Sequence, residues 1–322
     1  MRLTAYAPGK INLCLFLGET RPDGLHALVS LIEPLSLADE LTLEPRAGGC
    51  GIGVAAAPGV SGAPCEAGGD EVVCAGVEGP NLAGMALAAY RAASGWDGPP
   101  QRLTISKRVP VAAGMGGGSG DAAAALRLAA HAAGRPDDPA LVELAPQLGA
   151  DVPSQLAPGL VLVGGAGEEV HAAPARAAHG VLVLPSPHRL ATADVFREAD
   201  RLGLARPAEE LAQRRAALEQ ALAAGPGLPP ELLVNDLEPA ARSLCPPIDE
   251  ALTAALAAGA DRALVSGSGP TVVGIFWGLG GFDAATESAE RLRARQAGAI
   301  AACPVDADFA AVRVVRENDG CA

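Results

Sequence analysis

Residues 110–121 read PVAAGMGGGSGD, and the alanine-rich stretch that follows, to residue 133, has the composition of a helix. The glycines permit positive φ angles and let the backbone approach a ligand closely. Where such a loop opens a helix, free N–H groups and the helix dipole point at the same place, which suits phosphate oxygens. Together with an expected strand over residues 102–106, this segment predicts a strand, loop and helix unit that binds phosphate.

Two common phosphate-binding motifs do not fit this segment. The Walker pattern G-x-x-x-x-G-K-[ST] is absent from the sequence. A dinucleotide fingerprint needs G-x-G-x-x-G after an early strand and an acidic residue at the end of the next strand, and the sequence has neither. On these residues alone, a plain glycine-rich turn remains an equal alternative to a nucleotide loop.

Two distant segments change that balance. Residues 7–13 read APGKINL and residues 265–271 read VSGSGPT, and with residues 110–121 they resemble, in order, the three motifs of the GHMP kinase superfamily. The resemblance extends over nearly the whole chain. Three further segments resemble its diphosphocytidyl-methylerythritol kinase branch, namely RPDGLH at 21–26, GADVP at 149–153 and NDLE at 235–238.

The resemblance implies an α+β fold of two domains. Residues 1–165 would form an N-terminal domain like ribosomal protein S5 domain 2, with the nucleotide loop and the catalytic residues. Residues 166–322 would form a ferredoxin-like α/β sandwich that completes the substrate cleft. The boundary is placed at the glycine-rich run GGAG at 164–167, beyond which short strands and helices alternate.

The resemblance also implies an activity, the ATP-dependent phosphorylation of the 2-hydroxyl of diphosphocytidyl-methylerythritol in the methylerythritol phosphate route to isoprenoid precursors. ATP and Mg²⁺ are the implied cofactors, and a small molecule carrying a cytidine diphosphate group is the implied partner. By the family pattern, the ATP phosphates contact the loop residues Pro110, Val111, Ala112, Ala113, Gly114, Met115, Gly116, Gly117, Gly118, Ser119 and Gly120.

By the same pattern, Lys10 and Asp151 form the catalytic pair. Phosphoryl transfer depends mostly on positioning and charge neutralisation, with a carboxylate that accepts the proton of the substrate hydroxyl. Lys10 would hold Asp151 ionised and orient the hydroxyl, whereas the plainer interpretation of Asp151 is a turn residue before Pro153. Ser119 either binds a phosphate oxygen or Mg²⁺, or it simply caps the helix.

Two charged residues beside the loop have other expected roles. Asp121 would repel a triphosphate unless Mg²⁺ intervened, so we expect it to stabilise the first turn of the helix rather than act as the base. Lys107 precedes the loop and could contact the nucleotide, but the commoner explanation is an exposed lysine at a strand end, which we adopt.

Four residues are expected at the substrate. His26 matches the family's cytosine-binding histidine, and Phe196 matches an aromatic residue that stacks on the base, or else is a core phenylalanine. Leu25 stands where the family has a tyrosine, which reduces stacking worth roughly 1–3 kcal/mol per base. Asn12 lies beside the acceptor pocket or ties down a loop. Because of Leu25, a GHMP kinase for another small alcohol remains an alternative, as does a nucleotide-binding protein without catalysis.

The composition disfavours some classes of partner. The chain has 322 residues, 49% of them apolar, and a formal charge of −13; surfaces for nucleic acid or anionic membrane need clustered Lys and Arg. No stretch approaches the roughly 20 apolar residues of a membrane span, and the first residues lack a signal core. We therefore expect a cytoplasmic protein that binds no nucleic acid or membrane, as a monomer or weak homodimer. Its seven scattered cysteines are expected to be buried reduced thiols.

Local patterns place the remaining elements. Short strands separated by turn residues are expected through the first forty or so positions, including 11–17 and 41–43. A helix is expected at 81–93, with Asn81 as its cap and Met85 among its buried residues. Residues 46–79 are expected to form a long surface excursion or an irregular hairpin. Further helices are expected near 141–148, 207–224 and 248–258, and further strands at 160–163, 181–184, 262–265, 272–276 and around 312.

Overall fold

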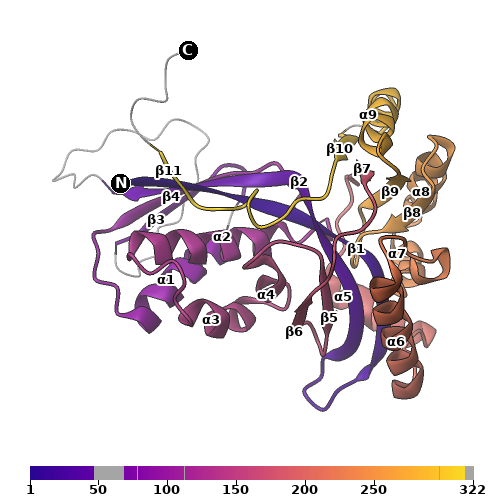
Figure 1. The fold of residues 1–322 in the computed structure, drawn as a ribbon, viewed down its shortest axis with the longest axis horizontal. Helices are drawn as coiled ribbons and strands as arrows, with labels where there is room; N and C mark the ends of the chain where they lie inside the picture. The colour runs from indigo at the N-terminus through magenta and orange to yellow at the C-terminus, as the bar shows by residue number, and fades with distance from the viewer. Residues whose placement is uncertain (47–68, 78, 112, 297, 316–322) are drawn as a thin grey trace.

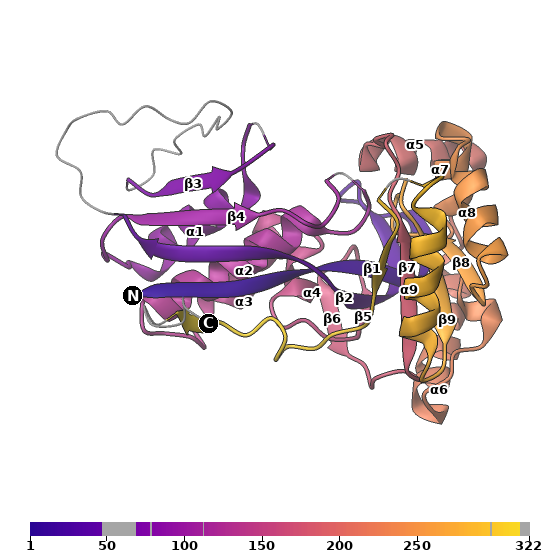
Figure 2. The same ribbon diagram turned by 90° about the horizontal axis from the view of Figure 1, so that it is seen from above.

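A long antiparallel hairpin of β1 (Arg2–Thr20) and β2 (His26–Pro45) is the central feature of the fold. The structure, a computed structural model, describes residues 1–46, 69–77, 79–111, 113–296 and 298–315. The hairpin runs from one lobe of the molecule into the other (Figure 1, Figure 2). The sequence predicted short strands through this region, including 11–17 and 41–43, and the structure joins them into two long strands.

The hairpin forms the middle of a seven-stranded sheet. The strand order is β11-β1-β2-β4-β3, with β5 paired to β2 and β6 paired to β5. The β3–β4 pair is parallel, and the others are antiparallel. The β1–β2 register shifts between Pro8 and Lys10 and between Asn12 and Cys14, and such irregularities re-aim side chains. The added strands are β3 (Glu71–Cys74), β4 (Gln101–Ser106), β5 (Val161–Gly164), β6 (Glu169–Ala172) and β11 (Arg313–Val315).

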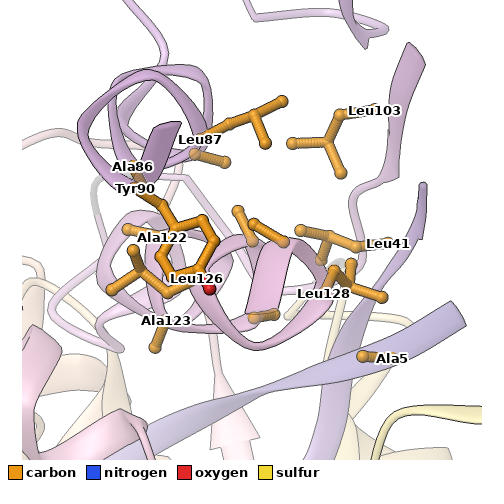
Figure 3. Close-up of a cluster of buried hydrophobic side chains, with 14 of the residues drawn as sticks. Ala5, Leu41, Ala86, Leu87, Tyr90, Leu103, Ala122, Ala123, Leu126 and Leu128 are labelled. Carbon is orange, nitrogen blue, oxygen red and sulfur yellow. The ribbon is translucent and has the colours of Figure 1, made fainter. Parts of the chain in front are cut away.

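Four helices lie in the same lobe as this sheet, and their layer covers one of its faces (Figure 1). Figure 3 shows part of the core between them, where Leu41 and Leu103 of the sheet lie near Leu87 and Leu126 of the helices. Residues 122–125, all alanine, are buried, and their small side chains allow close packing. The helices are α1 (Leu82–Ser94), α2 (Gly117–Ala132), α3 (Ala140–Leu148) and the short α4 (Val152–Gln155).

The second lobe contains a four-stranded antiparallel sheet. Its order is β10-β7-β9-β8, from β7 (His179–Leu184), β8 (Arg262–Val265), β9 (Val272–Trp277) and β10 (Ile300–Ala302). The far half of the hairpin packs on this lobe, because Phe16 and Val29 share a buried cluster with Val181 and Ile275. The helices of this lobe are α5 (Thr192–Leu202), α6 (Ala208–Ala224), α7 (Glu238–Leu244), α8 (Ile248–Ala257) and α9 (Gly281–Leu292), with a 3-10 turn at Pro230–Leu232.

The predicted helix signals at α1 are confirmed. Asn81 accepts a hydrogen bond from the Ala83 N–H at 2.9 Å, and Gly95 ends the helix with a φ of 64°. Met85 is 48% exposed, so its prediction as a buried residue was wrong. The buried residues of α1 are Ala83, Gly84, Ala86, Leu87 and Tyr90.

The structure tests the predictions made for the cysteines and for membrane crossing. Among the described cysteines, Cys14 and Cys245 are buried, while Cys74 and Cys303 are half-buried, and all four are free thiols. The prediction of buried reduced thiols is therefore confirmed for two of them and wrong about burial for the other two. Across the described ranges, no helix combines the length and the apolar character that a membrane crossing requires. Most of the expected 46–79 excursion lies outside the described residues.

Candidate active site

A cavity of about 960 Å³ lies between the hairpin, the glycine loop and helix α5. Ligand pockets commonly measure roughly 300–1,000 Å³, so this one has room for more than one small ligand. We call the part lined by Lys10, Asp151 and residues 113–119 the loop end. The part lined by Leu25, His26 and Phe196, near the tip of the hairpin, is the tip end. Sequence segments that were predicted to act together therefore do line one cavity.

At the loop end, α2 begins at Gly117, four residues earlier than the sequence predicted. Gly116 is its N-cap with a φ of 65°, and Gly114 has a φ of 74°, values that favour glycine. No described side chain caps this helix, so the N–H groups of its first turn are left for a ligand. Ser119 lies inside that first turn, and the alternative that it caps the helix was wrong.

Nearly all of the predicted nucleotide loop lines the cavity. Gly120 instead lies buried behind the loop, where a Cβ would be 3.1 Å from the carbonyl oxygen of Pro8. Ala112 lies outside the described residues. The residues on the cavity wall are Pro110, Val111, Ala113, Gly114, Met115, Gly116, Gly117, Gly118 and Ser119.

The third motif packs directly on the glycine loop. The Ser266 hydroxyl donates to the carbonyl oxygen of Gly114 at 3.2 Å. A Cβ on Gly114 would lie only 2.2 Å from the carbonyl oxygen of Ser266, so the two backbones approach too closely for any other residue. Gly267 and Gly269, with φ of 55° and 76°, form the turn on the other side. The third motif and the glycine loop are thus in direct backbone contact.

Lys10 and Asp151 meet at the loop end. The Lys10 ammonium lies 3.5 Å from Asp151 Oδ2 and donates to Asn12 Oδ1 at 2.9 Å. Asn12 Nδ2 donates to Ser30 Oγ at 2.7 Å, and Ser30 donates to the Cys14 carbonyl at 2.6 Å. Lys10, Asn12 and Ser30 are buried, whereas the Asp151 side chain is 39% exposed. The lysine is therefore fixed from behind, and the carboxylate is open to a ligand.

This arrangement can serve proton transfer and charge neutralisation at once. An ionised carboxylate beside a fixed ammonium can accept a proton from a bound hydroxyl. The N–H groups of α2 and the ammonium offer fixed donors to negative charge, and fixed donors need no rearrangement when that charge develops. The loop end therefore has the chemistry that phosphoryl transfer to a hydroxyl requires.

A second charge cluster lies beside the start of α2. Lys107 Nζ donates to Asp39 Oδ2 at 2.5 Å and to Asp121 Oδ2 at 2.8 Å. Asp39 also accepts the backbone N–H groups of Arg108 and Val109 through Oδ1. Burial raises the pKa of Asp121, the Lys107 charge lowers it and the Asp39 charge raises it again, to about 7. Asp121 is therefore protonated more easily than an ordinary aspartate.

Both expectations for this cluster were wrong. The Lys107 side chain is only 14% exposed, because it is held between two carboxylates instead of pointing into solvent. Asp121 lies in the second turn of α2, not the first, because the helix begins at Gly117. Its Oδ1 has no hydrogen-bond partner among the described residues, and both side chains line the cavity.

At the tip end, His26 is held by the backbone. Its Nδ1 donates to the Gly18 carbonyl oxygen at 2.9 Å, and its Nε2 lies 3.2 Å from Asp200 Oδ1 and 3.4 Å from Thr20 Oγ1. The Phe196 ring lies 5.3 Å from the imidazole between centroids, at an angle of 37°. The structure thus brings together two of the predicted substrate residues through side chains from β2 and α5.

The other two predicted substrate residues lie apart from each other. Leu25 lines the tip end and is 55% exposed, while Asn12 lies at the loop end, bound to Lys10.

Sequence reasoning missed Asp39, Ser30 and Asp200. No local pattern marks Asp39, whose partner Lys107 is 68 residues away along the chain. Asp200 does have a signal, because it follows Phe196 by four residues in a helix and such residues share a face.

Comparison with known families gives two matches. The model of the GHMP kinases N terminal domain matches residues 81–159, and that of the GHMP kinases C terminal domain matches residues 208–302. A protein of Anaeromyxobacter dehalogenans (strain 2CP-1) named 4-diphosphocytidyl-2-C-methyl-D-erythritol kinase is 37% identical over 313 residues, which cover 95% of this chain and 90% of the relative. A protein of the same name from Streptomyces coelicolor is 40% identical over 278 residues, covering 84% and 86%.

Solved structures give the same picture. The crystal structure of a 4-(cytidine 5'-diphospho)-2C-methyl-D-erythritol kinase matches with a TM-score of 0.69 and 31% identity, covering 94% of this chain and 98% of that one. The homoserine kinase of Cytophaga hutchinsonii matches with a TM-score of 0.67 and 17% identity, covering 98% and 97%. At that identity the second likeness shows the fold alone.

Proposed function

The chain belongs to the GHMP kinase family, in its 4-diphosphocytidyl-2-C-methyl-D-erythritol kinase branch, and we propose that Lys10 and Asp151 are its catalytic pair. It is an ATP-dependent kinase that phosphorylates the 2-hydroxyl of 4-diphosphocytidyl-2-C-methyl-D-erythritol, and the prediction of a two-domain α+β kinase is confirmed. The observation that supports the catalytic pair is the 3.5 Å approach of the Lys10 ammonium to Asp151 on the cavity wall.

In the proposed mechanism, Asp151 accepts the proton of the substrate hydroxyl as the phosphoryl group is transferred. Lys10 lies beside this carboxylate and offers a donor to the reacting oxygen. Asn12 holds Lys10 at 2.9 Å, so the ammonium needs no rearrangement during the reaction. The free N–H groups at the start of α2 face the phosphates and offset their charge.

The loop end fits a triphosphate. A Cβ on Gly116 would lie 2.9 Å from Lys10 Cγ, so the bare backbone leaves room that a side chain would fill. The N–H groups of the first turn of α2 and the Lys10 ammonium supply donors that suit phosphate oxygens. We place the phosphates of ATP, which this family uses, against residues 110–119. Gly120 would support the loop from behind, where its N–H donates to the carbonyl oxygen of Gly116.

Mg²⁺ is the proposed partner of ATP, with Ser119 as its protein ligand. No group of three or more His, Cys, Asp or Glu side chains suited to a metal occurs in the part of the chain that the structure describes. That agrees with the habit of Mg²⁺ in kinases, which relies on few protein oxygens together with substrate phosphates and water. The Ser119 hydroxyl lies on the Asp151 side of the loop, 3.9 Å from where a Cβ on Gly149 would be. When bound, the cation would neutralise charge on the phosphates.

The tip end is the proposed site of the cytidine diphosphate group. His26 and Phe196 would hold the base, Leu25 would contact it without stacking, and Asn12 would lie near the acceptor hydroxyl at the loop end. The support for this orientation is that the four residues line one cavity with the proposed ATP loop.

We further propose a functional division near residue 165, with the N-terminal part holding ATP and the C-terminal part completing the substrate cleft. The two separate sheets support this division, although β6 and β11 return to the first sheet. Because one chain lines the described cavity from both lobes, we propose that it acts as a monomer or weak homodimer.

The experiment that tests the function measures ATP-dependent phosphorylation of 4-diphosphocytidyl-2-C-methyl-D-erythritol by the purified protein, by Lys10→Ala and by Asp151→Asn. General acid–base groups contribute roughly 10²–10⁴-fold, so each variant should lose at least about 100-fold in kcat while still binding ATP. Asp137→Asn makes the same change at an exposed position outside the cavity and should keep wild-type activity.

Each contrary result has its own meaning. A protein inert with this substrate but active with another small alcohol would point to Leu25 as a mark of changed specificity. ATP binding without phosphorylation of any alcohol would favour the non-catalytic alternative. Full activity in Asp151→Asn would overturn the proposed catalytic pair, but the assignment of the substrate would still stand.

A further inference from the structure

Asp200 completes the tip end of the cavity. It lies on α5 four residues after Phe196, so both side chains project from the same face of that helix, and both line the cavity. His26 faces them from the start of β2, with its ring 5.3 Å from that of Phe196. An aromatic ring, an imidazole and a carboxylate therefore converge on one part of the wall.

One oxygen of Asp200 is engaged and the other is available. Oδ1 lies 3.2 Å from His26 Nε2, which donates to it when the ring is protonated. Because His26 Nδ1 is committed to the Gly18 carbonyl, the orientation of the ring is fixed from both sides. Within the described residues no hydrogen bond or ion pair engages Oδ2, and the side chain is 51% exposed. The carboxylate thus offers a ligand an acceptor next to the histidine.

We propose that Asp200 is a specificity-determining residue that accepts the exocyclic amine of a cytosine ring bound against His26 and Phe196. This inference rests on the proposed function, because it assumes that the base of the substrate occupies the tip end. An ionised carboxylate is an acceptor only, and Asp or Glu is the usual partner of the cytosine amine. Uracil carries a carbonyl oxygen at the same ring position, which would face the carboxylate as a second acceptor.

The size of the discrimination follows from the exposure of Asp200. A fully buried polar site rejects an analogue that lacks its hydrogen bond by about 10⁴-fold or more. A half-exposed carboxylate can keep water in place of the lost donor, so its contribution should resemble that of a single base contact, roughly 5- to 150-fold between cytosine and uracil. Because Leu25 offers no aromatic ring to stack on the base, hydrogen bonding should be the larger source of selectivity between the two bases.

The test compares Asp200→Asn with the wild type on paired ligands. The kcat/KM for 4-diphosphocytidyl-2-C-methyl-D-erythritol and for its uridine counterpart gives one cytosine-to-uracil ratio, and calorimetric Kd values for CDP and UDP give a second that does not depend on turnover. We expect a wild-type preference for cytosine of roughly 5- to 150-fold and a ratio near one in the variant. Asp200→Glu, which keeps the carboxylate, should retain part of the preference.

Asp249→Asn is the matched control. Like Asp200, Asp249 is a half-exposed aspartate on a helix with a basic partner; its side chain is 54% exposed and paired with Arg242. It lies outside the cavity, so its substitution should leave both ratios unchanged. Thermal melting of every variant checks the fold; if Asp200→Asn melts early, Asp200→Glu and the calorimetric ratio carry the test.

The outcomes separate this inference from the proposed function. An unchanged ratio in Asp200→Asn overturns the inference, and so does an equal loss with both bases, which would make Asp200 only a positioning residue for His26. If the wild type phosphorylates neither nucleotide alcohol but binds CDP over UDP through Asp200, the inference stands and the proposed function fails. If the wild type phosphorylates the cytidine substrate and Asp200→Asn has the same cytosine-to-uracil ratio, the function stands and the inference fails.

Discussion

The two ends of the cavity differ in how far their side chains are exposed to solvent. The loop end consists of backbone and of the buried side chains of Lys10, Asn12 and Ser30, which are at most 5% exposed, with the half-buried Asp151 carboxylate open to a ligand. At the tip end, Leu25 and the Asp200 side chain are more than half exposed. Fixed donors favour reaction because they need no rearrangement, whereas recognition can use side chains on the surface of a rigid frame. We therefore expect changes at the loop end to alter stability and kcat, and changes at the tip end to alter KM.

The largest effect should come from Gly114→Ala. The added Cβ would lie 2.2 Å from the Ser266 carbonyl oxygen, and the φ of 74° is unfavourable for alanine. Left-handed strain and overpacking together should lower the free energy of unfolding by about 3 kcal/mol. Displacing the loop by even 1 Å should lower kcat/KM by about 100-fold or more. Urea unfolding and steady-state kinetics measure the two effects.

Gly118→Ala is the control for this substitution. Gly118 is exposed, its φ is not positive, and a Cβ there would meet nothing within 4 Å. The free energy of unfolding of the Gly118→Ala variant should stay within about 1 kcal/mol of the wild-type value, or rise slightly, because alanine is the better helix former. Equal losses in both variants would show that the close contact with Ser266 is not what requires glycine.

Asn12→Ala should have the next largest effect. It removes the acceptor that holds Lys10 and leaves the Ser30 hydroxyl without its donor. Losing a hydrogen bond to a buried charge costs roughly 1.5–3 kcal/mol, so kcat should fall by about 10- to 100-fold with a smaller change in the KM for ATP. Ser30→Ala, which acts on Lys10 only through Asn12, should give a smaller loss in the same direction. A selective rise in KM for the alcohol would instead place Asn12 in substrate binding alone.

The Asp121 cluster should add a pH dependence to the loop end. The pKa of Asp121 is raised from 3.8 to about 7 in the folded protein. Between these two pH values, the folded state therefore holds a proton that the unfolded chain has lost. The free energy of unfolding should therefore fall as pH rises from about 4 to about 7, by at most about 1.4 kcal/mol per pH unit. Urea unfolding of the wild type and Asp121→Asn between about pH 5 and pH 8 measures this slope. An identical slope in both proteins would contradict it.

Leu25→Tyr should have the smallest effect and act in the favourable direction. An aromatic ring at this exposed position would stack on the base opposite Phe196, and a gain of about 1 kcal/mol lowers KM about fivefold with kcat unchanged. Leu256→Tyr, at a leucine that is 52% exposed and away from the cavity, is the control. A drop in kcat without a change in KM would indicate that the base lies elsewhere.

The sequence alone determined the features that depend on neighbouring residues. The glycine loop followed from backbone freedom, and the ends of α1 followed from Asn81 and Gly95, because caps act within one turn. The order of three short motifs was sufficient to indicate the family and to name Lys10, and the further segment GADVP at 149–153 named Asp151. At the tip end, His26 was named from the segment RPDGLH at 21–26, and Phe196 from its match to the family's aromatic position.

The tertiary structure decided what depends on distant partners. Lys107 looked like an exposed lysine until the fold brought Asp39 and Asp121 to it, from 68 and 14 residues away. Met85 fits a helical pattern, but the direction in which α1 faces the sheet leaves it exposed. Asp200 gains its meaning only from a histidine on another strand. Burial and long-range pairing arise from packing of the whole chain, and no local pattern encodes them.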